Sequence, residues 1–226
     1  LVASVDQGIG EVHRIKIEGF WQNMFDVPVI ADSSFSMLNY VHDFTFTDAL
    51  VNEGKGENYG IELTVERFMI KGYYYLLTGT FYSNRYKGGD EIWRNGRFDQ
   101  KIAANVLFGK EFNLREGRNL LGLNVRGSIT GGERYSPVLQ AASMNAEEVV
   151  FDEKRAFSQQ FDTHYIVDLS VTYRTNKENY STLWALQVKN LLGAKDPRFD
   201  YNFKTEKVDL IKEGLVLPLL SWKIEF

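Results

Sequence analysis

Hydrophobic residues recur at every second position through most of the chain. Aliphatic and polar residues alternate from Ile61 to Glu66, and the same alternation returns at 121–129, 167–174, 184–189 and 220–226. A period of two places successive side chains on opposite faces of an extended backbone, which is typical of a β-strand with one apolar and one polar face. Weaker alternation occurs at 12–25, 36–50, 73–86 and 98–112. The pattern therefore predicts an all-β protein with about nine strands.

The segments between these strands alternate in length. Short turns are expected at 68–72, 113–118 and 175–180, and long polar segments at 48–58, 87–97, 136–160 and 193–214. Barrels of the bacterial outer membrane have short periplasmic turns and long external loops. The runs at 73–86 and 98–112 are also long enough to cross a bilayer at a tilt. We therefore expect an antiparallel up-and-down transmembrane β-barrel whose long segments lie together on the outside.

A membrane barrel would present the two faces of each strand to different surroundings. The side chains expected to face lipid are Leu63, Leu123, Val125, Leu169, Val171, Leu186 and Ile224. The side chains expected to face the lumen are Glu62, Glu66, Asn124, Arg126, Asp168 and Lys189. Aromatic residues near strand ends, Tyr73 to Tyr75, Trp184 and Trp222, fit an interfacial girdle. A soluble sheet could hold the same aromatic residues in its core.

Composition narrows the function classes. The 226 residues include 26 Lys and Arg against 30 Asp and Glu, so the net charge of -4 lacks the basic footprint of a nucleic-acid-binding protein. Without cysteine, the chain has neither disulfides nor thiolate metal ligands. No apolar run approaches the roughly 20 residues of a membrane-spanning helix. Because the chain starts at Leu1 rather than Met and no signal segment precedes the first strand-like run, we expect a processed or excised piece.

Five stretches carry a family resemblance. They are Asn58–Arg67 (NYGIELTVER), Tyr74–Tyr86 (YYLLTGTFYSNRY), Gly131–Pro137 (GGERYSP), Gln187–Gly193 (QVKNLLG) and Ser221–Phe226 (SWKIEF). In their order and spacing they resemble the C-terminal part of the barrel of TonB-dependent outer-membrane receptors, particularly the large receptors of Bacteroidetes-type bacteria. The last two stretches look like the penultimate and closing strands of that family.

The resemblance implies a barrel of about 22 strands, filled by a plug, in the outer membrane of a Gram-negative bacterium. Such a receptor takes up a siderophore, a carbohydrate or a similar nutrient with energy delivered through TonB. Residues 1–226 would be the C-terminal segment of the barrel wall, without the plug domain. The implied partners are membrane lipid, the remaining barrel and plug, TonB through that plug, the barrel-assembly machinery and, in addition, a surface lipoprotein.

Enzymatic and metal chemistry find little support in the sequence. Glu62 and Glu66 form a carboxylate pair, but their spacing along a strand exceeds the separation that glycosidases use, so we expect a polar row. His13, His42 and His164 lie singly on different predicted strands, without the spacing of a metal site. No nucleophile elbow or phosphate-binding loop is present. We therefore expect no enzyme activity, no catalytic residues, no metal and no cofactor.

The external segments carry the candidate ligand-binding residues. Our choice is Trp93, Arg94, Arg97, Arg134 and Tyr135, because aromatic faces beside forked guanidinium groups suit sugars, peptides or anionic chelates. The competing interpretation is a solvated rim in which Arg94 and Arg134 pair with Asp90 and Glu133, or with phosphate groups of the outer leaflet, and never contact a ligand.

The end of the chain suggests an assembly signal. The alternating residues Trp222, Ile224 and Phe226 resemble the terminal aromatic pattern that the barrel-assembly machinery recognises.

A second architecture remains open. In a soluble β-sandwich, such as a carbohydrate-binding or other ligand-binding module, the aliphatic faces would pack against each other as a core instead of meeting lipid. An outer-membrane hydrolase is disfavoured because the catalytic groups are missing.

Overall fold

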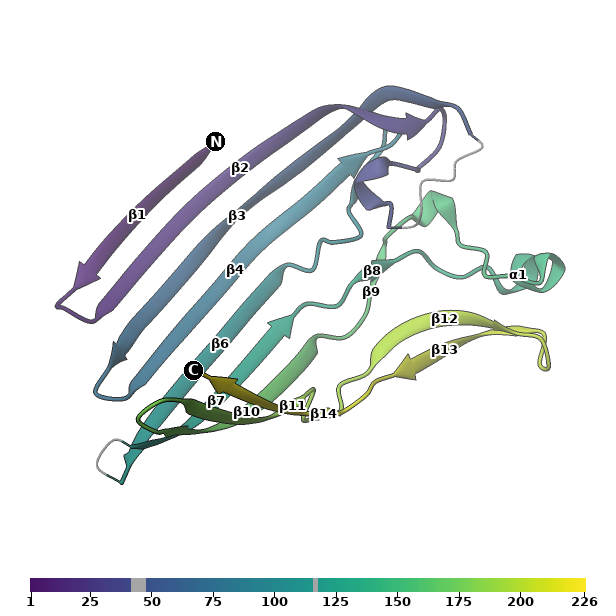
Figure 1. Cartoon of the computed structure of the whole chain (residues 1–226). Helices are drawn as coiled ribbons and strands as arrows, with labels where there is room; N and C mark the ends of the chain where they lie inside the picture. The colour runs from purple at the N-terminus through teal and green to yellow at the C-terminus, as the bar shows by residue number, and fades with distance from the viewer. Residues whose placement is uncertain (42–47, 116–117) are drawn as a thin grey trace.

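The chain folds into one large antiparallel sheet. A computed structural model describes residues 1–41, 48–115 and 118–226. The sheet follows the chain from one edge to the other (Figure 1) through β1 (Val2–Ile9), β2 (His13–Ile30), β3 (Leu50–Ile70), β4 (Tyr73–Lys87), β6 (Ile102–Leu114), β7 (Asn119–Thr130), β10 (His164–Asn176), β11 (Ser181–Lys189) and β14 (Leu217–Glu225). A short strand, β5 (Trp93–Asn95), pairs with the end of β4. The all-β prediction is confirmed.

Short turns join the strands at one end of the sheet, and long connections join them at the other end. Short turns follow β1, β3, β6 and β10 at one end, whereas long connections follow β2, β4, β7 and β11 at the other (Figure 1). The long connections hold every remaining element: η1 (Met37–Asn39), β8 (Arg134–Tyr135), α1 (Gln140–Ala146), η2 (Glu153–Arg155), β9 (Gln159–Gln160), β12 (Asp196–Asn202) and β13 (Lys207–Glu213). The expected alternation of short and long connections is therefore present. We call the second end the loop end.

Several predicted boundaries near the N-terminus were wrong. The described residues of the strand predicted at 36–50 do not bear it out: 36–41 contain η1, and of 48–50 only Leu50 belongs to a strand, β3. The loop predicted at 48–58 lies almost wholly within β3, so the long connection is 31–49 instead. The prediction missed β1 altogether, although Val2–Ile9 pairs with β2 over its whole length. The path across the main sheet has nine strands because these two errors cancelled, but β5 and the pairs β8–β9 and β12–β13 were not predicted. Residues 42–47, with His42, and 116–117 lie outside the described part.

Strand register confirms the division of residues between the two faces. Val171 pairs with Leu123 and Leu186, and Leu169 pairs with Val125. On the opposite face, Arg126 pairs with Asp168, and the Asp168 carboxylate accepts a hydrogen bond from Lys189 Nζ at 3.1 Å. Directly paired residues lie on the same side of a sheet. We call the two sides the Val125 face and the Arg126 face. The remaining residues of the predicted sets fall on the expected sides by the same register.

The Val125 face is apolar and bare. Leu63, Val125 and Leu186 are 45%, 40% and 46% exposed, although each lies within a strand that has partners on both sides. A contiguous apolar surface of this kind is rare on soluble monomers. The sheet is also open, because β1 and β14 each have one unpaired edge and no sheet in the described residues is closed. A complete barrel is therefore not seen. No described helix is long and apolar enough to span a membrane.

The long connections fold over the Arg126 face. Gly56 lies on this face, six residues before Glu62, and a Cβ there would come within 2.6 Å of Leu38 of η1. Tyr86 pairs with Gly56 and is fully buried, with its ring 5.9 Å from that of Phe157. Among the described residues, the fully buried side chains, Val29, Tyr86, Asp99 and Ser143, all lie at the loop end. The only substantial packing core in the described residues thus covers the polar side of the sheet.

Candidate functional site

A cavity of about 500 Å³ lies between the long connections at the loop end. The first connection contributes residues 34–36 and 39–41, the second Arg97, the third 133–136 together with parts of 151–161, and the last 197–199. This volume is within the range of small-molecule pockets. The long connections thus build a site that no single stretch of sequence contains.

Aromatic rings form one wall of the cavity. Tyr135 stacks on Phe161 with ring centroids 4.2 Å apart, and Phe199 lies 5.1 Å from Tyr135 and 5.8 Å from Phe161. Phe151 meets Phe199 edge-on at 6.1 Å. Ring pairs at such separations stabilise one another beyond their burial of area. The aromatic cluster, Tyr135, Phe151, Phe161 and Phe199, therefore joins the third and fourth connections.

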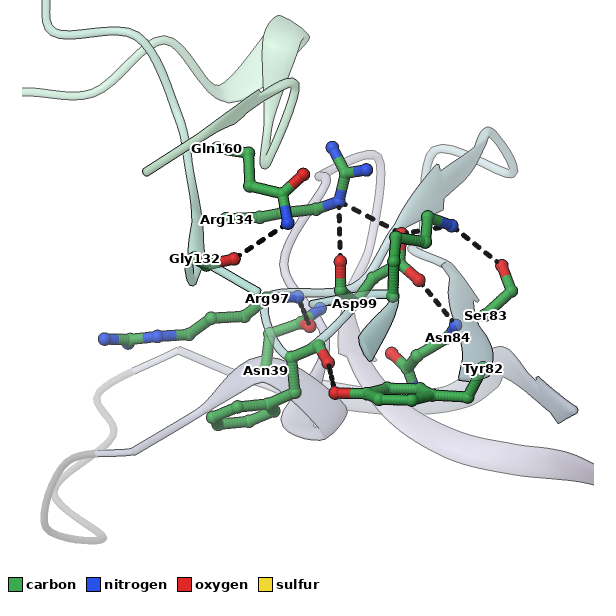
Figure 2. Close-up of polar contacts among 11 residues, drawn as sticks. Asn39, Tyr82, Ser83, Asn84, Arg97, Asp99, Gly132, Arg134 and Gln160 are labelled. Carbon is green, nitrogen blue, oxygen red and sulfur yellow. Dashed lines mark hydrogen bonds and ion pairs between the residues drawn. The ribbon is translucent and has the colours of Figure 1, made fainter. Parts of the chain in front are cut away.

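A buried carboxylate beside the cavity holds two connections to the sheet (Figure 2). Asp99 is fully buried, and its Oδ1 accepts a hydrogen bond from the backbone N–H of Asn84 at 2.8 Å. Its Oδ2 lies 3.0 Å from Arg134 Nε and 2.7 Å from Lys101 Nζ. Arg134 Nε also donates to the Asp99 carbonyl at 3.1 Å. Buried charges persist where they are paired and hydrogen-bonded, as this one is.

Arg97 lines the cavity. Its backbone N–H donates to Asn39 Oδ1 at 2.8 Å (Figure 2), and its carbonyl accepts the backbone N–H of Arg134 at 3.0 Å. Its Nε donates to Glu133, and the two side chains remain 31% and 38% exposed. Asn39 itself is 7% exposed, and its Nδ2 has no hydrogen-bond partner. The hydrogen bonds to Asn39 and Arg134 hold the Arg97 backbone in place, and neither of them involves its guanidinium group.

The structure brings three of the five predicted ligand-binding residues together. Arg97, Arg134 and Tyr135 line the cavity. Trp93 and Arg94 do not line it: Trp93 lies 5.7 Å below the guanidinium carbon of Arg85, and Arg94 pairs with Asp90. The expected pairing with Asp90 is thus confirmed for Arg94, whereas the expected pairing of Arg134 with Glu133 is wrong, because Arg134 bonds Asp99 instead. Glu133 and Arg134 are neighbours in an extended segment, so their side chains point to opposite sides.

The sequence analysis missed Asn39, Asp99 and Phe161 as parts of this site. Asn39 falls in a segment that was predicted to be a strand, and its position depends on η1, whose N-cap Ser36 accepts a hydrogen bond from Leu38 N. Asp99 falls in the run 98–112, which was predicted to be a strand although β6 begins only at Ile102, and Phe161 directly follows the long polar segment predicted at 136–160. A buried acid in a polar loop has no local sequence signal, because only its tertiary partners distinguish it from a solvated one.

The contribution of the Arg94–Asp90 ion pair to stability should depend on pH. Arg94 donates two hydrogen bonds to Asp90, at 2.8 and 2.6 Å, which lowers the pKa of Asp90 below its ordinary value of 3.8. The pair therefore stabilises the folded connection fully above pH 3.8, and this contribution is lost as the pH falls through the lowered pKa. Titration of a ¹³C-labelled Asp90 carboxyl by NMR should show a midpoint below 3.8, and Arg94→Gln should raise it. An unchanged midpoint in that variant would show that Arg94 is not the cause.

Neither a metal cluster in the described residues nor a similar known protein helps to define the function of the site. Within residues 1–41, 48–115 and 118–226, no cluster of three or more His, Asp or Glu side chains could hold a metal ion. His164 Nδ1 lies 3.5 Å from an exposed oxygen of Asp196, at the base of the hairpin formed by β12 and β13. Comparisons with protein-family models, with curated proteins and with solved structures found no match. The functional argument therefore rests on the geometry of the chain.

Proposed function

We propose that this chain is a section of the wall of an outer-membrane β-barrel, in a TonB-dependent receptor for nutrient uptake. The observation that carries the proposal is the contrast between the two faces. The Val125 face stays bare and apolar, whereas the long connections fold over the polar Arg126 face. In an outer-membrane barrel the outer face meets lipid and the inner face lines a polar lumen, which loops can fill.

The soluble sandwich fits this contrast less well. In a sandwich the apolar faces of two sheets pack together, and the polar faces meet water. Here the polar face is the one that carries packed loops, and the described residues supply no second layer for the apolar face. A sandwich would therefore need another molecule to cover the Val125 face.

The open edges support the same proposal. β1 and β14 each leave one row of backbone N–H and C=O groups unpaired within the sheet. Such edges are not stable in lipid, because every backbone group in a bilayer needs a hydrogen-bond partner. Further strands would complete the wall, and the family resemblance suggests about 22 in total with a plug inside. TonB would act through that plug.

The loop end is the proposed ligand entrance. External loops of barrels are long, and rigid walls allow such loops to vary for binding. Membrane lipid, the barrel-assembly machinery and a surface lipoprotein remain the partners that this role implies. Trp222 and Ile224 lie in β14, and Phe226 follows it fully exposed. Recognition of these three residues by the assembly machinery stays a prediction.

Site-directed spin labelling tests the wall assignment directly. The chain has no cysteine, so Leu169→Cys and Ser170→Cys each provide one labelling site on opposite faces of β10. In lipid vesicles we expect the label at position 169 to collide with oxygen, which concentrates in the bilayer. The label at position 170 should collide instead with a water-soluble nickel chelate. Electron paramagnetic resonance relaxation measures both collision rates.

A matched pair on another strand provides the control. Leu63→Cys and Thr64→Cys occupy the corresponding faces of β3, and they should reproduce the same contrast. If labels at positions 169 and 63 were shielded from both reagents, protein and not lipid would cover the Val125 face. That result would favour the sandwich and reject the barrel wall.

A further inference from the structure

We propose that the loop-end cavity binds a small organic anion with a flat apolar body, and that Arg97 holds its anionic group. The inference deepens the proposed function and rests on it only in taking the loop end as the ligand entrance. Its evidence comes from which polar atoms around the cavity lack partners, from the charges of the lining and from the aromatic cluster.

The polar nitrogens that lack partners around this cavity are hydrogen-bond donors. Arg97 and Arg134 each donate through Nε, and their Nη1 and Nη2 atoms make no hydrogen bond within the described residues. Asn39 Nδ2 is a further donor without a partner, in a residue that is more than nine-tenths buried. Arginine forks and amide N–H groups match the acceptor oxygens of a carboxylate, sulfonate or phosphate. The site is therefore suited to an acceptor-rich group.

The positive and negative charges around the cavity are nearly balanced, and Arg97 is the group best placed to hold an anion. Three arginines, Arg97, Arg134 and Arg198, line the cavity against two glutamates, Glu133 and Glu153. Arg134 and Arg198 have carboxylate partners in Asp99 and Glu213, at 3.0 and 3.2 Å. Arg97 differs, because its partner Glu133 itself lines the cavity and is partly exposed. An anion could therefore share or replace Glu133 at Arg97 without uncovering a buried charge.

The aromatic residues of the lining determine the rest of the ligand. Tyr135, Phe161 and Phe199 present aromatic surface in a space of about 500 Å³. Aromatic surface stabilises flat apolar groups by burial and by ring contacts. A single ring system with one anionic substituent would match both Arg97 and the aromatic residues of the lining.

Binding of 2-naphthoate, measured by isothermal titration calorimetry, tests the proposal on the detergent-solubilised protein. Uncharged 2-naphthamide is the matched ligand control, because it has the same ring and lacks the charge. We expect Arg97→Gln to weaken 2-naphthoate binding about tenfold, as loss of a charged hydrogen bond does. Glu133→Gln should strengthen it, because Arg97 then loses its competing partner. Lys177→Gln, an exposed charge change at the opposite end of the sheet, should leave it unchanged.

The variants keep the main-chain contacts of the site. Arg97→Gln retains the backbone bonds to Asn39 and Arg134, so its far-ultraviolet circular dichroism and thermal unfolding should match the parent protein. Equal affinity for 2-naphthamide and 2-naphthoate would overturn the anion assignment, as would weaker binding in Glu133→Gln. Absence of 2-naphthoate binding in the parent protein would overturn the whole inference. The spin-label contrast on β10 is independent of this cavity, so that result would leave the barrel wall standing.

Discussion

Replacing Asp99 by alanine should destabilise the protein by about 3 kcal/mol, one of the largest single effects that we expect. The substitution leaves the backbone N–H of Asn84 without its acceptor, in a place where the Asp99 side chain is fully buried. It also removes the carboxylate that Arg134 and Lys101 share. Equilibrium unfolding by urea, with the protein in lipid vesicles, measures the loss. Connections at the loop end should become sensitive to protease at lower urea than the strands.

Two companion variants separate the causes of this loss. Asp99→Asn keeps an acceptor for Asn84 but puts an NH2 donor in place of the oxygen that Arg134 and Lys101 share, so its cost measures the loss of those two contacts alone. Asp162→Ala removes a carboxylate whose side chain is 97% exposed, and it should change stability by less than about 0.5 kcal/mol. If Asp99→Ala were as mild as Asp162→Ala, the Asp99 contacts would not hold the loop end together.

Val171→Arg should destabilise the protein in lipid by roughly 2 to 4 kcal/mol, whereas Thr172→Arg should be mild. Val171 lies near the middle of β10 on the bare Val125 face, paired with Leu123 and Leu186. Thr172 lies on the Arg126 face, where an added guanidinium can reach a polar lumen. The free energy of folding into lipid vesicles, measured by tryptophan fluorescence across a denaturant series, gives both values. Equal sensitivity at the two positions would contradict the barrel wall.

A depth series distinguishes lipid from a protein core. Tyr165 lies on the same face as Val171 but near the loop end of β10, and its side chain is 53% exposed. In a bilayer the cost of arginine falls toward the interface, to about 0 to 1 kcal/mol. Tyr165→Arg should therefore cost much less than Val171→Arg. A similar cost at both positions would indicate a protein layer over the Val125 face, because packing in a protein core does not follow membrane depth.

The cavity explains why the five predicted ligand-binding residues divide into two groups. Arg97, Arg134 and Tyr135 belong to two connections that meet through the backbone bond from Arg134 N–H to the Arg97 carbonyl. Trp93 and Arg94 lie in β5 beside β4, and Arg94 is 9% exposed and paired with Asp90. Judged by residue type alone, all five were equally good candidates for ligand binding. Only the path of the connections decided which of them can contact a ligand together.

The sequence by itself determined the two faces of the sheet and the alternation of short and long connections. Both are local properties: side chains alternate along a strand whatever its partners, and turns interrupt that alternation. The assignment of Leu169 and Val171 to one side and Asp168 to the other was therefore confirmed. The all-β class follows from the same period of two.

Tertiary structure decided the limits of the first strands and the whole candidate site. Residues 36–50 alternate like a strand, yet Leu38 packs on Gly56, where the missing side chain leaves room for η1. β1 lacks a strong pattern of its own and is held by pairing along β2. Arg134 bonds Asp99 rather than the adjacent Glu133, because neighbours in an extended segment point apart. Contacts between residues distant in sequence carry no local periodicity, so only the folded chain could show them.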